Sequence, residues 1–377
     1  MAVSDNQCLI GSVLGGETAL WDRVGAVATD EFLEAGRDEG VLPLLDAEFR
    51  SGRDFATWPA QILSACRQAA LAQTGYELAH GAEIERVLTA LSRVAIAPLL
   101  LKGTGLAYGL YPSPALRPRS DSDLLVPTET RETAQRTLEE LGYRRTGGPA
   151  GKFVGYQTQM QRRDARGLAH NIDLHWRLSD AQSFAWLFSF AELTAAAVSV
   201  PELGPHASRL GNAHGLLHCL LHRASNNLFQ SPGFGDRLIW LYDIHLLVCT
   251  MTSAEQADFR AMAKTKRVGA IALEGLRRCA ARFPSPPLAA LIEALARSPE
   301  AKSGSALLGA SRLKREWIEL LAIPSATSRF IYLADRAFPS SAYVRERYPE
   351  SSASLLPLLH AQRWLEGFGK MARPARR

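Results

Sequence analysis

The chain has no long hydrophobic run: none of its 377 residues belongs to a stretch of eighteen apolar residues, so we expect no transmembrane helix. Asp5 and Glu17 stand among Gly and Ser where a signal peptide would be basic and then apolar, so none is expected. Cysteine is scarce, odd in number and without metal-type spacing; the five are Cys8, Cys66, Cys219, Cys249 and Cys279. This usage excludes a disulfide framework and indicates a reduced, cytoplasmic protein.

A strong charge of either sign is also missing. The 43 Lys and Arg residues exceed the 38 Asp and Glu residues by only five. Lys370, Arg373, Arg376 and Arg377 supply four of these charges within a final segment, 366–377, that we expect to be a disordered basic tail. The rest of the chain is therefore near neutral, which argues against nucleic acid as a partner.

The composition is sufficient for a large core, since 47% hydrophobic and 21% charged residues are typical of a globular protein. Residues 1–94 have helical spacing and no visible catalytic motif, with two helices expected between Trp58 and Val94. Residues 95–178 read as an α/β core, and residues 179–365 return to helical patterns. We therefore predict an α+β fold, with a small mixed sheet flanked by an N-terminal helical region and a larger C-terminal helical domain.

Two carboxylates open an apolar run within this core. Residues 121–126 read Asp-Ser-Asp-Leu-Leu-Val. Side chains two residues apart in a strand share a face, so Asp121 and Asp123 point the same way. The apolar end of the run is typical of a strand covered on both faces. Two like charges on one face repel unless a cation or solvent lies between them. Mg²⁺ suits this pair, with Mn²⁺ as an alternative, because Mg²⁺ is usually held by carboxylates together with substrate phosphates.

A third carboxylate has a similar setting. Residues 172–176, Ile-Asp-Leu-His-Trp, alternate apolar and polar side chains, so Asp173 and His175 share a strand face. Placed beside Asp121 and Asp123, Asp173 completes a set of three carboxylates that can hold two metal ions. Two metals about 4 Å apart can stabilise both the attacking and the leaving oxygen of a phosphoryl displacement.

A glycine turn precedes all three carboxylates. Residues 95–101 read as a buried strand, and the segment after Lys102 and Gly103 reads as a helix beginning at Thr104. Glycine allows the backbone to approach a phosphate closely, and a helix N-terminus offers unpaired N–H groups to an anion. Lys102 and Arg119 can each add a positive charge. The turn is therefore a candidate nucleotide-binding segment.

Three histidines follow in the C-terminal region. His214, His218 and His222 are spaced by four residues, so they share one face of a helix. A zinc site is one interpretation. The absence of a His-Glu-x-x-His pattern favours the other, in which the imidazoles form hydrogen bonds in the core or line the back of a cleft. His218 and His222 are the two that we expect to face substrate.

The order of these motifs resembles the DNA-polymerase-β-type nucleotidyltransferase superfamily. More closely, the chain resembles the bacterial uncharacterised nucleotidyltransferase family over about residues 90–260, with weaker similarity at Phe338-Pro339-Ser340 and Arg347-Tyr348. The matching segments are 100–107 (Leu-Leu-Lys-Gly-Thr-Gly-Leu-Ala), Tyr111-Pro112, 117–126, Leu141-Gly142-Tyr143 and 173–176. One departure is that Lys102 stands where the superfamily usually has a small residue, and Thr104 takes the place of its serine.

The resemblance implies an enzyme that moves a nucleoside monophosphate from an NTP to an acceptor hydroxyl and releases pyrophosphate. Asp121, Asp123 and Asp173 would be its catalytic metal ligands, with His175 beside them. The family-like Leu-Tyr-Asp-Ile-His motif around Asp243 suggests that this carboxylate fixes an arginine or the substrate, while a buried salt bridge or a helix-to-helix hydrogen bond is an equal alternative.

Other functions remain open from sequence alone. The fold could serve as a catalytically silent nucleotide- or peptide-binding accessory protein of a biosynthetic pathway. It could also transfer AMP onto protein side chains, as toxin-like relatives do. Asp121 and Asp173 could even be ordinary cap or turn carboxylates. The acceptor is not identified: a sugar phosphate, an antibiotic, a peptide and RNA all fit, and only RNA is disfavoured by the near-neutral charge.

Overall fold

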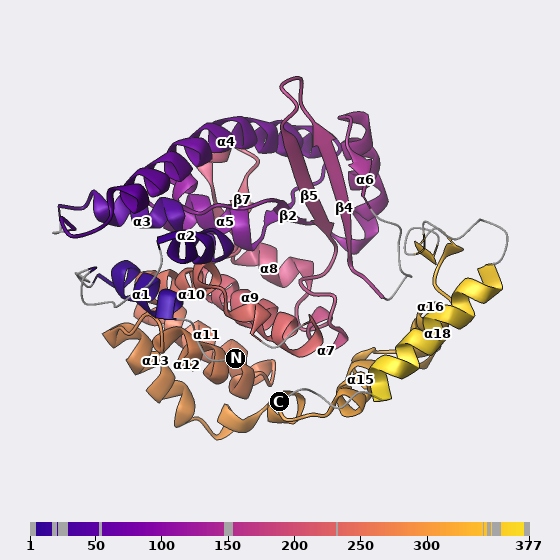
Figure 1. The fold of residues 1–377 in the computed structure, drawn as a ribbon. Helices are drawn as coiled ribbons and strands as arrows, with labels where there is room; N and C mark the ends of the chain where they lie inside the picture. The colour runs from indigo at the N-terminus through magenta and orange to yellow at the C-terminus, as the bar shows by residue number, and fades with distance from the viewer. Residues whose placement is uncertain are drawn as a thin grey trace.

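The computed structural model describes residues 5–16, 21, 29–52, 55–146, 154–230, 233–341, 343–344, 348 and 356–372. Within them the strands are β1 (Leu99–Leu100), β2 (Ser122–Leu125), β3 (Arg144–Arg145), β4 (Gln157–Arg163), β5 (Ala169–His175), β6 (Val198–Ser199) and β7 (Ser208–Arg209). They form one mixed sheet in the order β3-β4-β5-β2-β1-β7-β6 (Figure 1). Strand β2 runs parallel to β5 and antiparallel to β1. The predicted α+β class with a mixed sheet is confirmed.

The sheet extends beyond the core expected at residues 95–178. Strands β6 and β7 come from the region predicted to be mostly helical, and β7 pairs with β1 through Leu100 and Arg209. Two-residue strands carry no periodic signal, which is why the sequence did not indicate them. Strand β1 is also shorter than expected. Residues 95–98 close the preceding helix instead, since Ile96 N–H donates to the carbonyl of Leu91.

One long helix replaces the two expected between Trp58 and Val94. Helix α4 (Ala60–Arg93) is continuous through both of its glycines. Gly75 lies on an open surface, and Gly81 lies where an added Cβ would stand 2.5 Å from the Tyr108 hydroxyl. Gly81 therefore serves close packing of Tyr108 against the helix rather than a break.

Two hydrophobic clusters cover the two faces of the sheet. Helix α4 and helix α6 (Arg131–Glu140) pack on one face, where Leu124, Ile172 and Leu174 are fully buried. The side chains that alternate with these point to the other face. There, Leu125 belongs to the larger cluster, which includes residues of α5 (Lys102–Leu110), α9 (Asn212–Ser225) and α10 (Leu238–Thr250).

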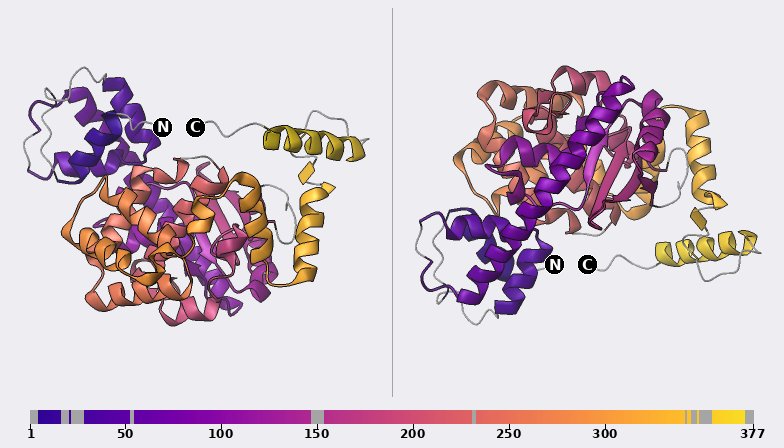
Figure 2. Two further views of the ribbon diagram at one scale, coloured as in Figure 1. Left: turned by 90° about the horizontal axis from the view of Figure 1, so that it is seen from below. Right: turned by 90° about the horizontal axis from the view of Figure 1, so that it is seen from above.

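The remaining helices extend the larger cluster at both ends of the chain. Its N-terminal part is α1 (Asp5–Leu14), α2 (Thr29–Asp38) and α3 (Leu42–Phe49), and its C-terminal part includes α11 (Ser253–Thr265), α12 (Gly269–Ala280) and α13 (Pro286–Ala296). Helices α15 (Arg312–Ala322), α16 (Ala326–Ala337) and α18 (Leu356–Ala372) follow, and α18 extends away from the body (Figure 2). No helix of the described part is both long and apolar enough to span a bilayer.

The tail expected to be disordered is in part helical. Residues 366–372 form the last turns of helix α18, even though two of them are glycines. Residues 373–377 lie outside the described part of the chain.

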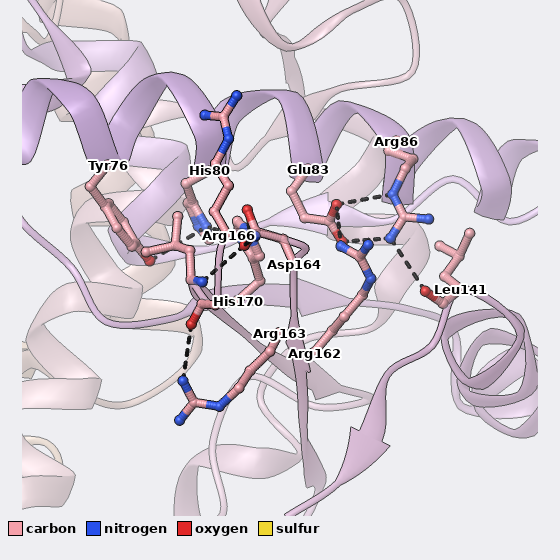
Figure 3. A network of polar contacts seen from close by, with 12 residues as sticks. Tyr76, His80, Glu83, Arg86, Leu141, Arg162, Arg163, Asp164, Arg166 and His170 are labelled. Atoms are coloured by element: carbon pink, nitrogen blue, oxygen red, sulfur yellow. Dashed lines mark hydrogen bonds and ion pairs between the residues drawn. The ribbon is translucent and has the colours of Figure 1, made fainter.

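Polar contacts also join α4 to the outer strands, on the face opposite the carboxylates (Figure 3). Glu83 accepts hydrogen bonds from Arg86, Arg162 and the Tyr143 hydroxyl. Nearer the centre of the sheet, His80 Nε2 lies 2.8 Å from Ser122 Oγ, directly behind the strand that carries Asp123. Helix α4 therefore supports the back of β2 by hydrogen bonding as well as by packing.

Candidate active site

Asp123 and Asp173 are neighbours across two parallel strands. They are register partners on β2 and β5, and both are buried. One ligand atom from each of Asp123, Asp173 and His175 lies within 4.8 Å of the other two. Since Leu124 and Leu174 face helix α4, strand alternation places the carboxylates on the opposite face. The convergence of Asp173 with the Asp-x-Asp pair, on which the sequence prediction depended, is thus realised for Asp123.

Asp121 joins this group from just before β2. Asp121 and Asp123 line the same pocket, which has a volume of about 320 Å³. Burial and the nearby Asp123 carboxylate raise the pKa of Asp121. The two side chains expected on one face are therefore brought to one pocket.

The two oxygens of Asp123 have different surroundings. Oδ1 lies 2.9 Å from His175 Nε2 and 3.3 Å from Lys102 Nζ. Oδ2 receives no hydrogen bond from any described residue and lies 3.8 Å from where a Cβ on Gly103 would stand. Burial alone would raise the pKa of Asp123, but Lys102 and His175 outweigh it and hold that pKa well below its usual range. Asp123 is therefore a fixed carboxylate with one oxygen free toward the glycine turn.

Asp173 has no hydrogen-bond donor within the described part of the chain, although it is only 7% exposed. Burial and the Asp123 carboxylate raise the pKa of Asp173 to about 6. A buried carboxylate beside another is unfavourable unless a cation compensates it. The oxygen donors of Asp121, Asp123 and Asp173 fit Mg²⁺ or Mn²⁺, while the nitrogen of His175 is already directed at Asp123. The donor set thus fits a hard divalent metal ion.

The glycine turn starts helix α5 directly after β1. Leu101 precedes it and provides no side-chain cap, so the first N–H groups of the helix are open to an anion. Gly103 has φ +20° and ψ −93°, a conformation that residues with a Cβ rarely adopt. Lys102 and Gly103 both line the pocket with Asp123. The glycine turn therefore lies at the same pocket as the carboxylates of Asp121 and Asp123.

Thr104 and Arg119, also predicted to bind nucleotide, have partners within the protein, although Arg119 also lines the pocket. Thr104 is fully buried, and its hydroxyl lies 2.6 Å from Ser122 Oγ and accepts from Arg119 Nε at 2.9 Å. Arg119 Nη2 donates to Glu77 Oε1 at 2.6 Å. The nearest atom of Arg119 to a Cβ added on Gly103 is its aliphatic Cδ, at 3.6 Å. Both side chains hold the turn against α4 and β2.

Close packing at the second glycine of the turn leads to a stability prediction. A Cβ on Gly105 would lie 2.8 Å from the Leu100 carbonyl oxygen, on a strand that cannot move freely. Gly105→Ala should therefore destabilise the protein by about 1–3 kcal/mol. The control is Gly75→Ala on the exposed face of α4, where nothing lies within 4 Å; it should stabilise by about 0.5–1 kcal/mol. Urea unfolding measures both, and equal midpoints for the two variants would contradict the packing argument.

The far wall of the pocket comes from two segments that lack an obvious sequence motif. Arg37 comes from helix α2, and Arg237 and Trp240 come from the start of α10. The Arg237 guanidinium donates to the carbonyl of Asp38, so the end of α2 is tied to the start of α10. The N-terminal region, in which no chemistry was visible, therefore contributes a positive charge to the pocket.

Two of the three histidines lie at this site. His222 Nε2 accepts from Lys102 Nζ at 3.1 Å and lines the pocket. His218 is buried beside it with an unpartnered Nε2, and burial together with Lys102 lowers its pKa to about 3. His214 instead packs against the Phe188 ring. The described residues contain no metal-type cluster of these three, so the zinc interpretation gains no support.

Asp243, predicted to fix an arginine or the substrate, is bound to Arg117. Its Oδ2 lies 2.6 Å from Arg117 Nη2, and its Oδ1 accepts from Arg117 Nε and from the Tyr111 hydroxyl. Both members of the pair are almost fully buried. Of the predicted alternatives, the structure has the arginine contact and the buried salt bridge.

The comparisons agree with this geometry. A sequence model of the family described as uncharacterised nucleotidyltransferase matches residues 25–284, more than two thirds of the chain. The protein therefore belongs to this family and is a nucleotidyltransferase. The match includes helix α2, the carboxylates and helix α10, and it ends before the weaker similarities noted near Phe338 and Arg347. No curated protein matches the chain.

Proposed function

We propose that this nucleotidyltransferase uses a divalent metal to move a nucleoside monophosphate from an NTP onto a hydroxyl of a small molecule or peptide, with release of pyrophosphate. The observation that supports the proposal is Asp173: a buried carboxylate without a donor, beside Asp123 and next to a pocket lined by cations. Such a charge arrangement favours the binding of a positive ion there.

Each residue of the site has a role in this reaction. Mg²⁺ or Mn²⁺ held by Asp121, Asp123 and Asp173 would supply positive charge that stabilises the phosphoryl oxygens. Lys102 and the N–H groups at Gly103 bind the phosphates. The acceptor oxygen forms a bond to the α-phosphorus, the bond from that phosphorus to the pyrophosphate oxygen breaks, and Asp173 takes the hydroxyl proton.

His175 and Lys102 have a second effect on the same carboxylate. Both direct their nitrogen atoms to Oδ1 of Asp123, which fixes the carboxylate plane and leaves Oδ2 toward the turn. His222 in turn contacts the Lys102 ammonium group. These residues therefore orient the charges of the site before any substrate arrives.

A nucleotide panel tests the proposal. With Mg²⁺, we expect one of ATP, CTP, GTP or UTP to raise the melting temperature, by an amount equivalent to about 2.7 kcal/mol at one hundred times its dissociation constant. Pyrophosphate release should follow when an acceptor is present, and chelation with EDTA should abolish it.

The panel also separates the alternatives. A thermal shift without pyrophosphate release under any acceptor condition would contradict turnover and favour a silent nucleotide-binding protein. A mass increase of co-expressed proteins by one nucleoside monophosphate would instead identify protein side chains as the acceptor. No shift and no release with any nucleotide would overturn the proposal.

A further inference from the structure

Within the described part of the chain, Arg117 is a buried arginine with one guanidinium nitrogen, Nη1, unpaired at the pocket. It lies between the short helical turn Pro114–Leu116 and β2, and its side chain is only 4% exposed. Nε and Nη2 both donate to the Asp243 carboxylate. Nη1 donates to no described residue and lies 3.8 Å from where a Cβ on Gly103 would stand. An arginine enclosed by protein thus presents its remaining N–H groups to the phosphate side of the glycine turn.

Arg119, only two residues away, has an acceptor for each of its guanidinium nitrogens. Its Nε donates to Thr104, its Nη2 to Glu77, and its Nη1 to the carbonyl of Arg117. Each of its three nitrogens thus has a protein acceptor, the longest contact being that of Nη1 at 3.5 Å. Arg117, by contrast, has no acceptor for Nη1 among the described residues.

We propose that Arg117, and not Arg119, is the arginine that binds the triphosphate. This assignment rests on the proposed function, and it names which cation contacts the phosphates beside Gly103. A phosphate oxygen is the acceptor that the free Nη1 lacks, and guanidinium groups match phosphate geometry well. Arg117 Nη1 and Asp123 Oδ2 both lie 3.8 Å from where a Cβ on Gly103 would stand, so the guanidinium and the carboxylates that would hold a metal face the same turn.

Asp243 and Tyr111 are positioning residues for this arginine. The carboxylate from helix α10 binds two guanidinium nitrogens at 2.6–3.2 Å, and the Tyr111 hydroxyl fixes that carboxylate at 2.8 Å. An arginine held in this way loses little conformational freedom when a phosphate binds, which strengthens binding. The family-like motif around Asp243 therefore acts on substrate through Arg117.

Binding of inorganic tripolyphosphate with Mg²⁺, measured by calorimetry on the full chain, tests the assignment. The double variant Arg117→Met with Asp243→Asn removes the guanidinium without leaving an unpaired carboxylate. We expect it to bind tripolyphosphate at least tenfold more weakly than wild type. The matched double variant Arg119→Met with Glu77→Gln removes the neighbouring pair, which contacts the glycine turn only through Thr104, and should weaken binding by less than the Arg117 variant does. The reverse ranking, or wild-type affinity in the Arg117 variant, overturns the assignment.

Two further measurements keep the test decisive. If the double variant does not fold, Arg117→Lys retains the charge without the planar fork; a loss of at least threefold supports the assignment, and wild-type affinity contradicts it. Tyr111→Phe should raise KM for the NTP while kcat changes little, as expected for a positioning residue. Binding of tripolyphosphate needs no turnover, so the two proposals can fail separately. If the Arg117 variant binds tripolyphosphate more weakly but the wild-type protein releases no pyrophosphate, only the proposed function is refuted. Unchanged binding in an active enzyme would refute only the role of Arg117.

Discussion

Replacing Asp173 by asparagine is expected to lower nucleotidyl transfer by about 10³-fold or more, while leaving the metal-free protein at least as stable as wild type. The loss of activity follows because the amide carries no charge and cannot replace a carboxylate at a divalent ion or accept the acceptor's proton. The unusual part of the expectation is the stability.

The stability expectation follows from the surroundings of Asp173. No described residue donates a hydrogen bond to its carboxylate, and the Asp123 carboxylate is its register partner on the next strand. Removing this charge therefore breaks no hydrogen bond and relieves a repulsion between two buried anions. A purely structural carboxylate, such as a cap or turn residue, would behave in the opposite way, because its removal would leave N–H groups unsatisfied.

Melting temperatures with EDTA and with Mg²⁺, together with pyrophosphate release, measure both effects. In wild type, Mg²⁺ should raise the melting temperature; in Asp173→Asn, the EDTA value should equal or exceed that of wild type and Mg²⁺ should add little. Asp258→Asn, an exposed residue of helix α11, is the control that should change neither quantity. A marked fall of the EDTA melting temperature in Asp173→Asn, or wild-type turnover, would remove Asp173 from the proposed site.

The carboxylate cluster could be predicted from sequence because its signal is local. Strand alternation determines that Asp123 and Asp173 each point away from the flanking leucines, whatever the rest of the fold does. The two carboxylates then meet if their strands are parallel neighbours, as β2 and β5 are. Gly103 was similarly visible, since a glycine between a buried strand and a helix marks a turn with unusual backbone angles.

The partners of the arginines were not visible, because they come from distant parts of the chain. Arg117 and Asp243 are separated by 126 residues, and nothing in either neighbourhood indicates the other. Sequence spacing made Arg119, which is closer to Asp121, the natural phosphate contact. A third element, helix α4, supplies Glu77, which accepts a hydrogen bond from Arg119 Nη2. Which of the two arginines keeps an unpaired nitrogen depends on these long-range contacts, and a single sequence does not reveal them.

Loss of the Glu77 side chain is expected to destabilise the protein by about 3–5 kcal/mol. Glu77 Oε1 accepts from both Arg119 Nη2 and the Tyr108 hydroxyl, and the Arg119 and Glu77 side chains are 2% and 6% exposed. Glu77→Ala thus leaves a guanidinium charge buried and unpaired, beside a hydroxyl that has lost its acceptor. Since Arg119 also holds Thr104, the damage should extend to the glycine turn.

The midpoint of urea unfolding measures this cost, and an exposed pair supplies the scale. Glu293 and Arg297 also form an ion pair, but their side chains are 62% and 75% exposed, so Glu293→Ala should cost less than about 1 kcal/mol. Adding Arg119→Met to Glu77→Ala should recover part of the lost stability, because the second change removes the charge that the first one left unpaired. If Glu77→Ala were as mild as Glu293→Ala, Arg119 would have to be free to leave Glu77. It would then be available to the phosphates, and the division of roles between Arg117 and Arg119 would fail with it.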